Sequence, residues 1–209
     1  PMGGNCQAVG IFTAKTSVGD DGGMGNALFA NETYEVKGSG SDIGGSADGF
    51  YWTYKEIAGN FMMKASLQWG AADVPVLNTT ESVQSKKMGI MIRESANDPA
   101  SRFVFAQMRR EYGADLAYRL ETGRTSAETP GIVVQYPGDT NTVLLIRSGS
   151  AFSMYRETEN GDSYFIGQID CPGLPHTIAA GLAVSAHSAT MVERALFSNV
   201  EITPIPSLI

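Results

Sequence analysis

The stretch GSGSDIGGSADGFYWTY, which runs from Gly38 to Tyr54, decides the fold. Its first part is rich in glycine, serine and aspartate, which favour turns because glycine reaches positive φ at no steric cost. In its second part Phe50, Trp52 and Tyr54 would share one face of a strand, and Tyr51 would lie on the other. The sequence therefore predicts a long polar turn that leads into an aromatic strand. We expect the first three rings in the core and Tyr51 exposed.

Other segments show the period of two residues that is typical of strands. Phe61 to Trp69 alternates apolar and polar side chains, and Asn160-Gly161 is the strongest hairpin signal. Roughly a dozen such strands, with no long helical period, predict an all-β fold: a two-sheet antiparallel β-sandwich that forms a single domain over residues 1–209. The expected strands are residues 8–13, 28–29, 33–37, 50–54, 61–69, 88–93, 102–109, 115–121, 132–135, 142–147, 151–157, 163–169, 177–186 and 192–202. Residues 16–26, 70–86 and 122–131 are expected to be loops.

Composition argues against two classes of partner. The 209 residues include 24 glycines and 43% hydrophobic residues, which is typical of a folded sheet protein with many tight turns. The net charge of −7 argues against nucleic acid, because that affinity comes mainly from Lys and Arg on phosphates. No apolar run reaches the ~18 residues that a membrane-spanning helix needs.

One pair of aspartates could bind a metal ion, and one pair of cysteines could form a disulfide. Asp20 and Asp21 have glycines nearby and could hold Ca²⁺, which prefers hard oxygen ligands on a flexible loop. Their spacing is not that of an EF-hand, and a solvated turn is the alternative. Cys6 and Cys171 could form one disulfide across a very long loop or stay as two buried thiols.

Five blocks of the sequence, in order, are GSGSDIGGSADGFYWTY (38–54), KKMGIMIRES (86–95), LLIRSGSAFSMYRETENG (144–161), HTIAAGLAVSAHS (176–188) and ALFSNVEI (195–202). Together they resemble a bacterial concanavalin A-like domain, a LamG-like jelly roll related to lectins and glucanases. Such domains are appended to secreted or cell-surface carbohydrate-active proteins. The resemblance implies a jelly-roll sandwich and brings no assigned catalytic residue. Gly44 stands where the family pattern G-x-G-x-D-I-W-G has a tryptophan. If that tryptophan stacks on sugar in the family, this chain has lost the stacking platform.

The motifs of catalysis are missing from the sequence. Retaining glucanases of similar fold use E-x-D-x-x-E, because the nucleophile and the acid must lie about 5–5.5 Å apart, and no E-x-D occurs in this chain. His176 and His187 have no second His or Cys at metal-ligand spacing, and no G-x-S-x-G is present. Asp42 and Asp48 lie in the Gly/Ser loop, where we expect their carboxylates to accept backbone N–H bonds. A non-catalytic domain is favoured, and a carboxylate pair from different strands stays open.

The candidate ligand-binding residues lie on three consecutive predicted strands that we expect to be neighbours in one sheet. They are Arg93, Gln107, Arg109 and Arg119, with Tyr51 as a candidate stacking ring. Burying so many polar groups in a core would be costly, and we therefore expect this face to be a solvated groove. Its arginines would suit the carboxylates or sulfates of an acidic polysaccharide. The alternative is that Arg93 forms a structural ion pair with Glu94.

The sequence thus favours a non-catalytic carbohydrate-binding or lectin-like domain of a secreted bacterial protein. The first alternative is an interaction or adhesion module that packs against a neighbouring catalytic domain and binds no glycan. The second is a glycoside hydrolase or lyase of the same fold. An exposed surface with aromatic and planar polar side chains would distinguish the first function from the first alternative.

Overall fold

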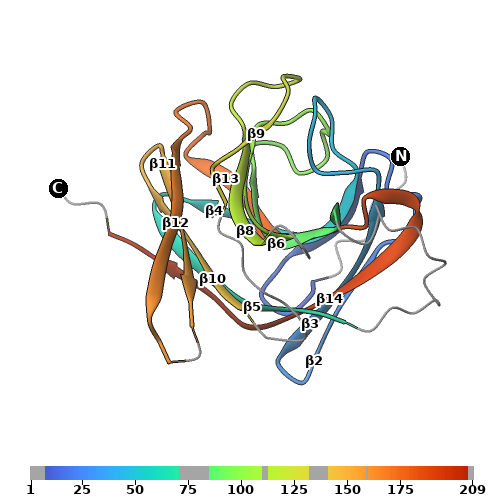
Figure 1. Ribbon diagram of the computed structural model, residues 1–209, viewed down its shortest axis with the longest axis horizontal. Helices are drawn as coiled ribbons and strands as arrows, with labels where there is room; N and C mark the ends of the chain where they lie inside the picture. The colour runs from blue at the N-terminus through green and yellow to red at the C-terminus, as the bar shows by residue number, and fades with distance from the viewer. Residues whose placement is uncertain (1–7, 71–84, 110–112, 132–140, 159, 207–209) are drawn as a thin grey trace.

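The protein is a sandwich of two antiparallel sheets (Figure 1). Each sheet has seven strands within the described residues. The computed structural model describes residues 8–70, 85–109, 113–131, 141–158 and 160–206. The first sheet has the order β1 (Ala14–Val18), β4 (Phe50–Ala58), β13 (Thr177–Ser185), β6 (Lys87–Arg93), β7 (Phe103–Arg109), β8 (Gly113–Arg119) and β9 (Ala127–Glu128). The second has the order β12 (Ser163–Asp170), β11 (Ala151–Glu157), β10 (Asn141–Ser148), β5 (Phe61–Trp69), β14 (Ser188–Pro204), β3 (Thr33–Gly40) and β2 (Asn26–Ala30). The predicted all-β jelly-roll sandwich is confirmed.

Most predicted strands are present, and the errors are at the sheet edges. The expected strand 8–13 is wrong: Val9 and Phe12 form a single bridge around a turn in which Gly10 has a φ of 59°. β1 and β9 instead form in segments that were expected to be mostly loop. Both are edge strands of the first sheet. They are held by backbone hydrogen bonds to one neighbouring strand, so their side chains show little alternation in the sequence. The expected strand 132–135 lies outside the described residues.

The main core lies between the two sheets. The side chains of β5, β10 and β11 that face inward, among them Phe61, Met63 and Phe152, have no exposed surface. They meet Ile90, Val104 and other apolar residues of the first sheet in one continuous cluster. This alternation of buried and exposed positions follows from the two-residue period of a strand with one face on the core.

A second, smaller core covers the other face of the first sheet. Its ten buried members come from the strands and from the loop that precedes β4; they are Val18, Ile43, Phe50, Trp52, Met91, Phe103, Phe105, Ala117, Ala179 and Ala183. The predicted burial of the first two rings of the aromatic strand is therefore confirmed, and Tyr54 is half-buried and stacked on Trp52 at 4.5 Å. This first sheet is consequently apolar on both faces over much of its area.

The polar turn before β4 folds as the glycine content predicts. Gly40 has a φ of 111°, and a Cβ atom there would lie 2.0 Å from the carbonyl oxygen of Gly49. The chain therefore closes on itself at this point in a way that only glycine permits. The loop between them, residues 41–49, is placed over the first sheet. Within the described residues, no helix has the length and apolar character needed to cross a membrane.

Candidate functional site

The predicted ligand-binding residues do share one face of the first sheet, but the prediction that this face is a solvated groove is wrong. β6, β7 and β8 are neighbours in the first sheet, as expected, and Arg93, Phe103 and Arg119 are direct partners across them. Arg93, Gln107 and Arg119 nevertheless have exposures of 0%. In this structure these three side chains offer no surface to a ligand.

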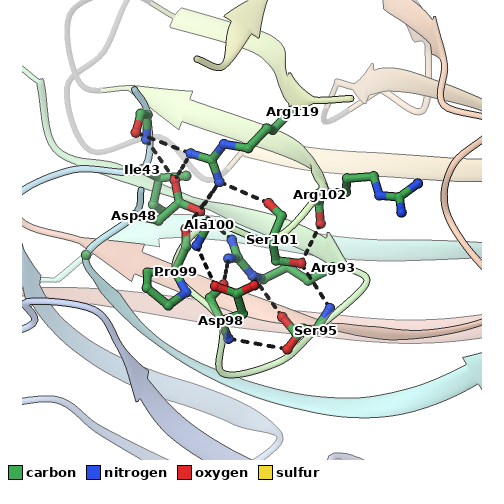
Figure 2. A network of polar contacts seen from close by, with 12 residues as sticks. Ile43, Asp48, Arg93, Ser95, Asp98, Pro99, Ala100, Ser101, Arg102 and Arg119 are labelled. Atoms are coloured by element: carbon green, nitrogen blue, oxygen red, sulfur yellow. Dashed lines mark hydrogen bonds and ion pairs between the residues drawn. The ribbon is translucent and has the colours of Figure 1, made fainter. Parts of the chain in front are cut away.

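Figure 2 shows what replaces the groove: the carboxylate of Asp48 lies between two guanidinium groups. Asp48 Oδ2 accepts from Arg93 Nη1 at 2.6 Å and from Arg119 Nη1 at 2.8 Å, and Oδ1 accepts from Arg119 Nη2 at 2.7 Å. The Gly44 N–H also donates to Oδ1 at 3.1 Å, as expected for a structural carboxylate. Burial lowers the pKa of the Arg93 guanidinium and Asp48 opposes that shift. The alternative partner Glu94 is bound to Arg102 instead.

Both arginines also hold loops onto the sheet. Arg93 Nη2 donates to the carbonyl oxygen of Asp98, and Arg119 donates to the carbonyl oxygens of Pro99, Ser101 and Gly45. Backbone bonds join the same loops, from Asp48 to Pro99 and from residue 126 to residue 45. The loops 41–49, 94–102 and 120–126 therefore form one cover over this end of the first sheet. Arg93 and Arg119, which suggested a groove in the sequence, instead bind these loops to the sheet.

A second polar cluster occupies the other part of the same face. Gln107 Nε2 donates to Asp115 Oδ1 at 2.6 Å and to Glu128 Oε1 at 3.2 Å. Arg109 Nη2 pairs with the same two carboxylates, at 2.5 Å and 3.2 Å. Burial raises the pKa of Asp115, while Gln107 and Arg109 oppose that rise. Only Arg109 and Glu128 keep exposed surface here, and the ligand-binding role of Arg109 stays a prediction.

Tyr51 is not the exposed ring that the sequence predicted. Its exposure is 7%, and it belongs to the main core between the sheets. The prediction was wrong because both faces of β4 are covered. Trp52 and Phe50 fill the smaller core, so the opposite face meets the second sheet.

Asp42 connects the loop cover to the strand β6 and to the turn after β13. Its Oδ1 atom accepts from the Ile43 N–H at 2.8 Å, as expected, and lies 2.8 Å from Lys87 Nζ. His187 Nδ1 is 3.3 Å from the same oxygen but outside hydrogen-bond geometry. A Cβ atom on Gly44 would lie 2.8 Å from Asp42 Oδ2, so this glycine leaves the carboxylate uncovered.

We expect Asp42→Asn to lower the free energy of unfolding by roughly 1–2 kcal/mol, the usual cost of losing a charge-assisted bond. Lys87 is nearly buried and would lose its charged partner, while among the described residues it would keep the Ile43 carbonyl as an acceptor. Urea denaturation of both proteins measures the difference. A large loss of ligand binding with unchanged stability would contradict a structural role for Asp42.

The remaining predicted sites have simple placements. Asp20 and Asp21 lie in the loop before β2, and within the described residues no three His, Cys, Asp or Glu side chains gather as a metal site. Cys171 is buried, and Cys6 lies outside the described residues, so their pairing stays a prediction. The Ser185 hydroxyl, the nearest in sequence before His187, donates to the carbonyl oxygens of Gly40 and Gly49.

An exposed aromatic surface lies on the outer face of the second sheet, where β12, β11, β10 and β5 run side by side (Figure 1). Phe165 of β12 is 58% exposed, and its ring packs edge-on against Tyr155 of β11 at 5.5 Å. Leu144 of β10 and Lys64 of β5 continue the same row across the sheet. We call Phe165, Tyr155 and the polar pairs beside them the aromatic surface.

Two polar pairs flank these rings on the same face. Ser153 Oγ donates to Gln168 Oε1 at 2.8 Å, one step along β11 and β12 from the rings. On the other side Lys64 Nζ bonds both carboxylate oxygens of Glu157, at 2.9 Å and 3.1 Å. All four side chains keep exposed surface. The arrangement places the exposed Phe165 ring and the half-buried Tyr155 ring beside amide, hydroxyl, ammonium and carboxylate groups on the outer face of the second sheet.

Sequence reasoning missed this surface, although a signal existed. Asn160-Gly161 predicts a hairpin, and a hairpin places a residue of one strand opposite one of the next. The exact partners depend on a bulge between Met154 and Tyr155, which shifts the register of β11 against β12. Without knowledge of that bulge, the pairing of Tyr155 with Phe165 could not be found.

No protein-family model and no curated protein matches this chain. Solved structures do share its fold. A functionally unknown protein from Saccharomyces cerevisiae is 11% identical, with a TM-score of 0.63 over 90% of this chain and 100% of that one. Carbohydrate-binding module CBM66 from Bacillus subtilis is 17% identical, with a TM-score of 0.55 over 92% and 97%. Peanut lectin is 12% identical, with a TM-score of 0.50 over 97% of each chain. At these identities the likeness establishes the jelly-roll fold.

Proposed function

We propose that this domain is a non-catalytic carbohydrate-binding module and that it binds its ligand on the aromatic surface. The observation that carries the proposal is the contact of the exposed Phe165 ring with the half-buried Tyr155 ring, beside two polar pairs on the same outer face. The fold is one that carbohydrate-binding modules and lectins use. The proposal keeps the expected secreted or cell-surface location.

The chemistry of the aromatic surface suits a sugar chain. A pyranose ring presents C–H groups on its faces and hydroxyl groups around its rim. An exposed aromatic ring gives apolar contact to the faces, while Gln168, Ser153, Lys64 and Glu157 offer donors and acceptors to the rim. These polar groups are already paired, so they are held in place before the ligand arrives.

The charges favour a neutral glycan. The expectation of an acidic ligand depended on a solvated row of arginines, and Arg93 and Arg119 are instead buried against Asp48. On the aromatic surface Lys64 is neutralised by Glu157, and Glu201 is its direct partner on β14. No excess of positive charge remains among these groups to attract carboxylates or sulfates.

We expect Phe165→Ala to weaken binding about tenfold, because stacking of a ring is worth roughly 1 kcal/mol or more beyond the area that it buries. Affinity electrophoresis in gels that contain neutral or acidic polysaccharides measures the effect. Tyr164→Ala is the matched control. Tyr164 is 53% exposed and adjacent in sequence, but it pairs with Arg156 and points to the opposite side of β12.

The outcomes separate the alternatives. Retardation by a neutral polysaccharide that Phe165→Ala weakens about tenfold and that Tyr164→Ala leaves unchanged supports the proposal. Retardation by acidic polysaccharides alone would overturn the neutral ligand. A protein that no polysaccharide retards, with both variants folded, would favour the interaction or adhesion module.

A further inference from the structure

One end of the sandwich contains a pocket of about 380 Å³. It lies between the turn that joins β4 to β5, the turn that joins β10 to β11, and the loop that joins β12 to β13. Two of these connections carry the chain from one sheet to the other. Arg147, on the inward face of β10, lines the pocket and is only 5% exposed. The pocket therefore contains a nearly buried positive charge.

Arg147 uses three of its N–H groups to hold the surrounding backbone. Nε donates to the carbonyl oxygen of Gly149 at 3.2 Å, Nη1 to that of His176 at 3.0 Å, and Nη2 to that of Pro175 at 2.7 Å. A guanidinium group has five N–H donors. One N–H on each terminal nitrogen of Arg147 is therefore left without an acceptor among the described residues.

The positive charge of Arg147 also lacks a counter-ion. In the described part of the chain no carboxylate pairs with it, whereas Arg93 and Arg119 share the carboxylate of Asp48. Carbonyl oxygens carry only partial charges, so three of them do not cancel a full positive charge. Burial accordingly lowers the pKa of the Arg147 guanidinium. Because buried arginines are nearly always paired, the unmatched charge indicates an anionic ligand.

The rest of the pocket lining is polar and has no acidic group. Asn60 Oδ1 accepts from the Gly149 N–H at 2.8 Å, and no described residue accepts from its Nδ2 group. The exposed Ser150 hydroxyl and His176 ring are two further polar groups. None of the described residues that line the pocket is Asp or Glu, although the chain has 22 acidic residues. The pocket is therefore free of negative side chains in an acidic protein.

We propose that this pocket binds a small anion and that Arg147 donates to the carboxylate, sulfate or phosphate group of the ligand. Guanidinium N–H groups match the oxygens of such groups, and Asn60 Nδ2 and the Ser150 hydroxyl can donate to the same ligand. The volume falls in the range of small-molecule sites. Arg147 lies on the inward face of β10, while the aromatic surface is on the outer face of the same sheet, so this site does not depend on the proposed function.

Thermal unfolding and isothermal calorimetry of the whole chain test the proposal. Sodium phosphate, sodium sulfate and sodium glucuronate are each compared with NaCl at equal ionic strength. At least one of the three anions should bind at one site per chain. At about a hundredfold excess over Kd it should raise Tm by about 5–10 °C above the value in NaCl. The anion that binds most tightly identifies the group that the pocket recognises.

Ser150→Asp supplies a carboxylate from the protein itself. Ser150 is exposed and lines the pocket, so the new side chain can pair with Arg147 without disturbing its backbone contacts. We expect anion binding to weaken by about tenfold or more and Tm in anion-free buffer to rise. Ser148→Asp is the matched control. It adds the same charge at an exposed position outside the pocket, so Kd should stay unchanged.

Two results would overturn the site. One is the absence of both heat and a Tm shift beyond that of NaCl with all three anions. The other is an anion response that Ser150→Asp leaves unchanged. Neither result bears on binding of a neutral glycan to the aromatic surface, which is measured separately with Phe165→Ala.

Discussion

Asp48→Asn is expected to lower the free energy of unfolding by about 3–5 kcal/mol, the usual cost of removing one partner of a buried ion pair. The change leaves the guanidinium groups of Arg93 and Arg119 buried, with 0% exposed side chains, and without their shared carboxylate. It also weakens the acceptor for the Gly44 N–H. Urea denaturation, monitored by circular dichroism, measures the loss.

Glu94→Gln is the matched control. Glu94 forms a similar two-bond pair with Arg102, at 2.8 Å and 3.2 Å, but these side chains are 32% and 29% exposed. Solvent screens such pairs, so we expect a loss of less than about 1 kcal/mol. Equal losses for the two variants would show that the Asp48 network does not hold the loop cover.

Trp52→Ala is expected to cost about 3–5 kcal/mol, because it opens a large cavity in the smaller core. Trp52 has no exposed surface, lies 4.5 Å from the ring of Tyr54 and 5.9 Å from that of Phe50, and donates from Nε1 to the Ala96 carbonyl at 3.2 Å. The substitution therefore removes both the filling under the loop 94–102 and a bond that fixes it. Chemical denaturation gives the loss.

Trp52→Phe separates the two contributions. It keeps an aromatic ring and removes the indole N–H, which leaves the Ala96 carbonyl without this donor. We expect the variant to lose about 1–3 kcal/mol, less than Trp52→Ala. A loss below 1 kcal/mol for Trp52→Ala would mean that the loops close the sheet without support from this ring.

Both predictions concern the loops that cover the first sheet: Asp48 binds them to the sheet, and Trp52 fills the space beneath them. The first sheet has the side-chain pattern of an open binding face, with arginines and aromatic rings on adjacent strands. Its own loops bind those groups, so the face is part of the folded core. On the second sheet, by contrast, the ring of Phe165 is 58% exposed.

The sequence by itself determined the fold class, most strands and the faces on which their side chains lie. Phe61 to Trp69 and Ala151 to Glu157 were predicted with the bounds that the structure has. The reason is that the two-residue period of a strand is local: it depends on backbone geometry that each segment carries by itself. The same period correctly placed Arg93, Gln107 and Arg119 on one face.

Only the tertiary structure decided what covers each face. Arg93 and Arg119 were expected in solvent because their partner Asp48 is separated from them by 45 and 71 residues. Tyr51 was expected to be exposed because alternation gives two faces and cannot say that both are buried. The pairing of Tyr155 with Phe165 depended on a bulge. The covering of a sheet face and the register of two strands both arise from contacts between distant segments. A local sequence pattern therefore cannot predict them.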